Sequence, residues 1–165
     1  MNIAVIGTGN VGGALAQKWA GKGHTICLGV RDMGGFKGNA IVAHENIKAL
    51  SIDEAVQKSD IILLAVPAAN TIEAVKALGD TTGKIIIDAM NIIMNKGPEG
   101  FTNTSDAILA NTQTEDVVKC FNTTGYNNMA DTVYDDMQID MFVCGNSTKG
   151  KEAATALRAK KRQHS

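Results

Sequence analysis

The chain has 165 residues, a formal net charge of −1 and 4% aromatic residues. This length suits a single domain with a buried core, and the near-neutral charge gives no reason to expect nucleic acid or an anionic membrane as a partner. Its longest apolar runs are too short to span a bilayer and its start does not resemble a signal peptide, so we expect a cytoplasmic protein.

A glycine-rich turn follows the first apolar run of the chain. Residues 2–6 predict a buried strand, residues 7–13 carry the turn, residues 11–20 have a helical pattern, and residues 25–30 predict a second strand. A glycine motif that leaves a strand and opens a helix within about thirty residues is typical of a dinucleotide-binding turn. The same residues would also suit a glycine-rich turn that binds nothing.

Each glycine of this turn has a separate predicted role. Gly7 allows the chain to reverse sharply out of the strand, and Gly12 allows the helix to pack closely on it. Gly9 has no side chain, so a pyrophosphate can approach the backbone. The helix start then offers unpaired N–H groups and the positive end of the helix dipole to the phosphates.

The residues after the second strand indicate which dinucleotide binds. Arg31 at this position favours the 2′-phosphate of NADP, whereas an acidic residue would favour the ribose hydroxyl of NAD. Asp32 is the next residue and keeps NAD open as the less favoured alternative, since side chains alternate along a strand and only one of the two can face the ribose. Lys37, in the glycine-rich segment that follows, would add a second positive charge.

The clearest strand of the chain is residues 60–67, which is apolar on both faces like a central parallel strand. Pro67 is suited to open the following helix, residues 68–78. Ligands of open parallel sheets bind at the carboxyl ends of the strands. We therefore expect Val66 and Pro67 to lie beside the glycine turn and to flank the nicotinamide.

A further buried strand, residues 84–88, ends in polar groups at the same edge. Asp88 and Asn91 either shape the nicotinamide site or bind local backbone groups, and the pattern leaves both open.

Three cysteines, Cys27, Cys120 and Cys144, fall in predicted strands with no metal-binding spacing, so we expect no metal site and three buried, reduced thiols.

The remaining segments complete an alternation of strands and helices. The polar run 122–129 predicts a substrate-facing loop after a strand. The sequence thus predicts an α/β fold, a Rossmann-type, doubly wound and mostly parallel sheet, in one domain over residues 1–165. The other predicted elements are helices at 39–46, 51–58, 105–111 and 151–160, strands at 48–51, 115–122 and 140–145, and a basic tail at 158–165.

With these elements placed, the chain resembles the deazaflavin (coenzyme F420)-dependent NADP oxidoreductases and their bacterial relatives, over nearly its whole length to about Ala156. The resemblance implies a Rossmann fold, NADP(H) as cofactor and hydride transfer to a small-molecule partner, a deazaflavin or flavin among the candidates. It places Thr8, Gly9, Asn10 and Val11 at the phosphates and Thr124 at the nicotinamide. It rests on the motifs at 6–12, 29–31, 64–67, 87–91, 121–125 and 141–145.

Two features depart from the family pattern. Val30 stands where the family usually has a serine, so one phosphate hydrogen bond is expected to be missing. Family members continue past the last helix into a strand and an apolar helix that close the active site and build a dimer, whereas this chain ends in Arg- and Lys-rich sequence. We expect these closing elements to be missing, although a homodimer stays possible.

The leading hypothesis is an NADP(H)-dependent oxidoreductase in which the cofactor carries the chemistry; no catalytic acid or base is assigned. The alternatives are an NADP(H)-binding module without turnover and a relative of the cytosolic domain of membrane metalloreductases, against which the chain shows no transmembrane segment. The predicted cofactor-binding residues are Gly7, Thr8, Gly9, Asn10, Val11, Gly12, Arg31, Lys37, Val66, Pro67, Asn91 and Thr124.

Overall fold

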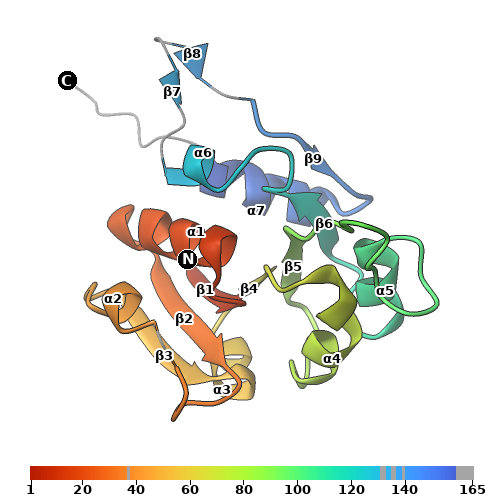
Figure 1. Ribbon diagram of the computed structural model, residues 1–165, viewed down its shortest axis with the longest axis horizontal. Helices are drawn as coiled ribbons and strands as arrows, with labels where there is room; N and C mark the ends of the chain where they lie inside the picture. Colours follow the sequence, from red (N-terminus) through yellow and green to blue (C-terminus); the bar gives the residue numbers. More distant parts are fainter. Residues whose placement is uncertain (37, 131–132, 135–136, 139, 159–165) are drawn as a thin grey trace.

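The computed structural model describes residues 1–36, 38–130, 133–134, 137–138 and 140–158. Strands and helices alternate from residue 2 to residue 130, and three short strands and a helix follow (Figure 1). The strands are β1 (Asn2–Ile6), β2 (Thr25–Val30), β3 (Ile47–Ser51), β4 (Ile61–Leu64), β5 (Ile85–Asp88), β6 (Val117–Cys120), β7 (Val133–Tyr134), β8 (Met137–Gln138) and β9 (Val143–Cys144). The helices are α1 (Asn10–Gly21), α2 (Asn39–Val42), α3 (Ile52–Gln57), the 3₁₀ turn η1 (Ala68–Asn70), α4 (Thr71–Lys76), α5 (Thr104–Ala110), α6 (Asn127–Ala130) and α7 (Thr148–Arg158).

Seven of the strands form one sheet in the order β3-β2-β1-β4-β5-β6-β9. Every neighbouring pair from β3 to β6 is parallel, and β9 is antiparallel to β6. The chain starts at β1 in the middle, builds β2 and β3 on one side and then returns to build β4 to β6 on the other. This confirms the predicted doubly wound sheet, and it places the topological switch point between β1 and β4, where ligands of such sheets bind.

The central strands are buried on both faces because helices cover both sides of the sheet. In β1, Ile3 and Val5 face one core with α1 and α7, while Ala4 and Ile6 face the other with α3 and α4. Figure 1 shows α1, α6 and α7 gathered on one side of the sheet and α3 and α4 on the other. This period of two explains the continuous apolar runs of the sequence.

Several element boundaries differ from the sequence-based expectation. The predicted helix 68–78 is a 3₁₀ turn followed by α4, which ends at Lys76. The segment 122–129, predicted as a loop, contains the start of α6, whose Met129 is buried in the core beside α1. The predicted helix 151–160 begins earlier, at Thr148, and the basic residues 159–165 lie outside the described residues.

Two of the three cysteines behave as predicted. Cys27 and Cys120 are buried free thiols, and burial raises the pKa of Cys120 to about 11, which keeps it protonated and unreactive. The prediction was wrong for Cys144, whose side chain is exposed. The reason is its position on β9, a strand of two residues that pairs only with β6 at the edge of the sheet.

No helix in the described part of the chain is long and apolar enough to cross a bilayer.

Candidate cofactor site

The turn after β1 requires glycine at two positions. Gly7 has φ of 98°, and a Cβ there would lie 2.5 Å from the carbonyl oxygen of Ala65 at the end of β4. Gly12 is buried in the first turns of α1, where a Cβ would collide with the carbonyl oxygen of Gly7. The predicted steric roles of both glycines are confirmed, and together they bring the start of α1 against the carboxyl ends of β1 and β4.

Gly9 has a different environment. It is the exposed N-cap residue of α1, with φ of −71°, and no other segment of the described chain has an atom within 4 Å of a Cβ built on it. The fold therefore does not need a glycine here. No side-chain hydrogen bond caps the helix and no acidic residue lies in its first turn. Unpaired N–H groups at the start of a twelve-residue helix suit an anion, and only a glycine lets that anion approach the backbone closely.

A pocket of about 280 Å³ begins at the glycine turn and extends towards Arg31. It is formed by the carboxyl ends of β1 and β2 and by η1 and α4, which follow β4. Val66 and Pro67 line it together with Gly7, Thr8 and Arg31, so they lie beside the glycine turn as expected, and their position at the nicotinamide stays a prediction. Its lining residues are Ile6, Gly7, Thr8, Gly29, Val30, Arg31, Phe36, Ile52, Val66, Pro67, Asn70, Glu73, Ala74 and Ala77.

Of the two neighbouring charges after β2, Arg31 lines this pocket and Asp32 does not. The Asp32 carboxylate instead accepts a hydrogen bond of 3.0 Å from the N–H of Gly34, which stabilises the turn. The structure therefore places Arg31, and not Asp32, at the pocket, while the preference for NADP over NAD stays a prediction. Lys37 lies outside the described residues, but the half-buried ring of Phe36 lines the pocket.

A second hollow, of about 510 Å³, also borders the glycine turn. Thr8, Gly9 and Asn10 line it together with Tyr126 and Asn127 at the start of α6. Sequence reasoning assigned no role to these last two residues, although it identified the polar run that contains them. Their approach to the glycine turn depends on how the chain leaves β6.

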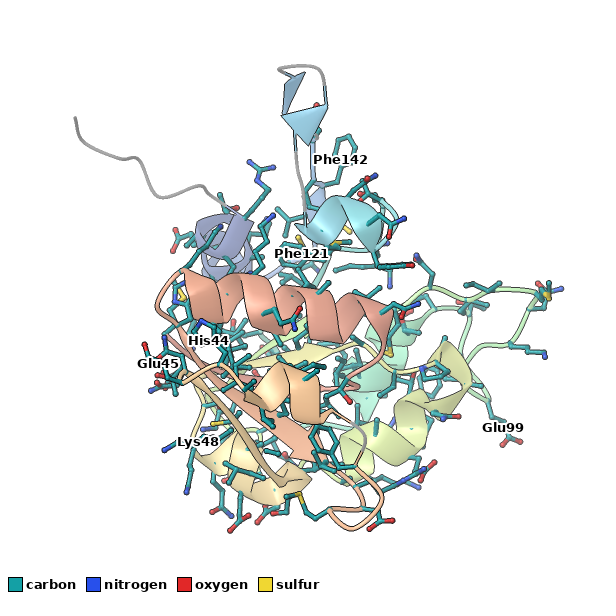
Figure 2. The ribbon with its side chains drawn as sticks, turned by 60° about the vertical axis from the view of Figure 1, so that its left-hand side comes forward. His44, Glu45, Lys48, Glu99, Phe121 and Phe142 are labelled. Atoms are coloured by element: carbon teal, nitrogen blue, oxygen red, sulfur yellow. The ribbon has the colours of Figure 1, made fainter. Side chains whose placement is uncertain are left out.

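That path is set by Phe121, which directly follows β6. Phe121 has φ of 61° and packs edge-on against Trp19 of α1, with ring centroids 5.4 Å apart. Figure 2 shows Phe121 between α1 and α6. The left-handed backbone turns the chain back over α1, because the aromatic pair holds a residue that would otherwise avoid this conformation. Residues 122–127 are therefore carried towards the start of α1.

Two further predicted residues, Asn91 and Thr124, lie near the ends of β5 and β6. The side-chain amide of Asn91 donates to the carbonyl oxygen of Asn122 at 2.7 Å, and the Asn122 amide donates back to Asn91 Oδ1 at 3.2 Å. This pair joins the two strand ends. The hydroxyl of Thr124 is buried and has no hydrogen-bond partner among the described residues. Neither residue is among those lining the two pockets described above.

Asp88 is fully buried at the end of β5 and makes a network of local contacts. Its carboxylate accepts hydrogen bonds from the N–H of Met90 at 2.9 Å and from the hydroxyls of Thr104 and Ser105 at 2.6 and 2.7 Å. It also forms an ion pair of 2.9 Å with Lys119 of β6. Of the two interpretations of Asp88, the geometry supports the structural one, since its oxygens hold together β5, β6 and α5.

Comparisons with known proteins agree with this geometry. A structure of a candidate F420-dependent NADP-reductase from Arthrobacter sp. FB24 superposes with a TM-score of 0.80 at 26% identity, covering 99% of this chain and 82% of that one. The glycerol-3-phosphate dehydrogenase of Coxiella burnetii superposes with a TM-score of 0.73 at 15% identity, covering 97% of this chain and 51% of that one, a likeness of fold alone.

Among curated proteins, the glycerol-3-phosphate dehydrogenase [NAD(P)+] of Nitratidesulfovibrio vulgaris is 32% identical over 111 residues. The match covers 59% of this chain and 34% of that protein, so the chain spans about a third of this curated relative. Residues 2–92, more than half of the chain, match the family described as NADP oxidoreductase, coenzyme F420-dependent. The resemblance predicted from the sequence motifs is thereby confirmed, and the chain belongs to the coenzyme F420-dependent NADP oxidoreductase family.

Proposed function

We propose that the chain binds NADP(H) along the carboxyl edge of its sheet and transfers hydride between this cofactor and a small-molecule acceptor, a deazaflavin or flavin being favoured. The observation that carries the proposal is the position of Arg31. Its guanidinium lines a pocket that begins at the glycine turn, at the place where a 2′-phosphate would distinguish NADP from NAD. Membership of an NADP-dependent oxidoreductase family supports it.

The residues of the site fit the groups that NADP carries. In the proposed arrangement, the pyrophosphate lies on the N–H groups at the start of α1, beside Thr8, Gly9, Asn10 and Val11, because no other segment of the described chain comes within 4 Å of a Cβ built on Gly9. Arg31 binds the 2′-phosphate, with Lys37 as a second predicted partner. The ring of Phe36 offers a flat apolar surface to the adenine.

The nicotinamide side of the proposed site lies towards β5 and β6. Asn91 and Asn122 would fix the edge that the nicotinamide ring passes, and the hydroxyl of Thr124 stays a predicted contact. Bound NADPH would supply the hydride, and the protein would contribute positioning and exclusion of water.

Replacing Arg31 by alanine is expected to weaken NADPH binding about tenfold to a hundredfold, because a hydrogen bond to a charged group contributes about 1.5–3 kcal/mol. NADH lacks the 2′-phosphate, so its affinity should change by less than about twofold. Titration followed by nicotinamide fluorescence measures both affinities. Lys48→Ala is the matched control, because it removes one positive charge at an exposed lysine on β3. It should leave both affinities unchanged. An equal loss for NADH and NADPH, or a wild-type protein that binds NADH as tightly as NADPH, would contradict the assignment of Arg31.

Turnover is tested by following NADPH absorbance with a panel of acceptors: a deazaflavin, free flavins, quinones and ferric chelates. We expect the deazaflavin or a flavin to be reduced with one NADPH oxidised per two electrons accepted, and no NADPH consumption without an acceptor. Tight NADPH binding with no acceptor reduced would contradict the proposed hydride transfer and support a module that binds NADP(H) without turnover.

A further inference from the structure

Arg31 has a partner that no sequence motif indicated. Its Nη1 donates a hydrogen bond of 2.8 Å to Oε1 of Glu73, which lies 42 residues further along the chain on α4. Both side chains line the pocket that begins at the glycine turn. The group proposed to bind a phosphate therefore already contacts a carboxylate inside the same pocket.

The charges around this pair are few. Among the described residues that line the pocket, Arg31 is the one cation and Glu73 the one anion. Asp32, which follows Arg31 in the chain, is hydrogen-bonded to Gly34 and does not line the pocket. If a carboxylate in this pocket repels a bound phosphate, we therefore expect that carboxylate to be Glu73.

The pair is open to solvent, with side-chain exposures of 77% for Arg31 and 64% for Glu73. An exposed ion pair contributes little to stability, so a ligand can separate it. A 2′-phosphate that binds Arg31 has to share the guanidinium with the Glu73 carboxylate or displace it, and in either case the two negative charges lie near each other. A ribose hydroxyl at the same place carries no charge and meets no such repulsion.

We propose that Glu73 competes with the 2′-phosphate for Arg31 and thereby limits the preference of this site for NADP over NAD. The proposal rests on the proposed function, because it needs the adenosine end of the cofactor in this pocket. It assigns specificity to two residues together: Arg31 attracts the 2′-phosphate, and Glu73 reduces that attraction.

The test replaces Glu73 by glutamine, which keeps the shape of the side chain and removes its charge. Isothermal titration calorimetry compares NADPH with NADH, and adenosine 2′,5′-bisphosphate with 5′-AMP. The two small fragments report on the adenosine end alone. We expect about a three- to tenfold gain in affinity for the ligands that carry a 2′-phosphate, a gain that shrinks at high salt, and less than about a twofold change for NADH and 5′-AMP.

Two further variants control the experiment. Glu45→Gln makes the same change of net charge at an exposed glutamate before β3, beside His44 and Lys48 in Figure 2, and should leave all four affinities unchanged. In an Arg31→Ala background, Glu73→Gln should raise the affinity for 2′-phosphate ligands by a smaller factor, because there is no guanidinium to release from the ion pair with Glu73. Circular dichroism checks that each variant is folded, as expected for exposed positions.

The possible outcomes separate the two proposals. If wild-type protein binds neither NADPH nor the bisphosphate, the proposed function and the role of Glu73 are both overturned. If wild-type protein binds them but Glu73→Gln brings no selective gain, or weakens the binding of 2′-phosphate ligands, the competition is overturned while the proposed function stands. Weaker binding of 2′-phosphate ligands to Glu73→Gln would show that Glu73 positions Arg31 instead of competing with its ligand.

Discussion

Replacing Gly9 by valine is expected to weaken NADPH binding at least about a hundredfold, equivalent to about 2.7 kcal/mol, while the protein stays folded. The backbone of Gly9 has φ of −71°, which valine adopts readily, and a Cβ there meets no other segment within 4 Å in the described part of the chain. The branched side chain would occupy the space over the start of α1 that we assign to the pyrophosphate. The N–H donors of the helix would remain, but the phosphate oxygens could not reach them.

Fluorescence titration with NADPH and NADH measures the loss, which should affect both dinucleotides equally because both carry the pyrophosphate. Gly21→Val is the matched control, since Gly21 is the last residue of the same helix and also has open space around it. Thermal unfolding of the two variants should be similar. Unchanged nucleotide affinity in the Gly9 variant would show that no diphosphate rests on this turn.

A second large effect is expected from Lys119→Met, which should lower the free energy of unfolding by about 3–5 kcal/mol. The Asp88 side chain is fully buried, and Lys119 is the cation that contacts it, at 2.9 Å. Lys119 also donates to the carbonyl oxygen of Met90 and to Thr104 Oγ1. Removing the ammonium leaves a buried carboxylate without a countercharge, whereas the methionine side chain keeps most of the apolar packing.

Urea unfolding measures this loss. Lys149→Met is the matched control because it removes the exposed Lys149–Asp116 ion pair of 3.2 Å, which should contribute at most about 1 kcal/mol. The double variant Asp88→Asn/Lys119→Met should recover part of the stability, since both members of the buried pair are then neutral. If Lys119→Met costs no more than Lys149→Met, the buried pair does not hold β5 and β6 together as described.

Much of the fold and part of the site could be predicted from the sequence because the relevant interactions are local. The run from Asn2 to Gly12 contains a buried strand, the glycine that reverses it and the glycine that lets the helix pack, all within a few residues of one another. The apolar runs of β4 and β5 likewise indicate burial on both faces. These features depend on residue type and spacing alone, and the structure confirms them.

Other features of the site could not be predicted because they join residues from separate crossover units. Glu73 meets Arg31 only because α4 returns beside the end of β2, and Lys119 meets Asp88 only because β6 pairs with β5 in one register. Tyr126 reaches the glycine turn only after Phe121 turns the chain over α1. The polar run that contains Tyr126 indicated a ligand-facing segment but not which residues face the ligand.

The sequence by itself determined the order of strands and helices, the doubly wound sheet and the glycine turn, because spacing along the chain encodes burial and backbone conformation. The tertiary structure alone decided which charged side chains meet. It places Arg31 and not Asp32 in the pocket, pairs Arg31 with Glu73 and pairs Asp88 with Lys119. It also decided that Cys144 is exposed. Those outcomes depend on the packing of distant segments, which local periodicity does not encode.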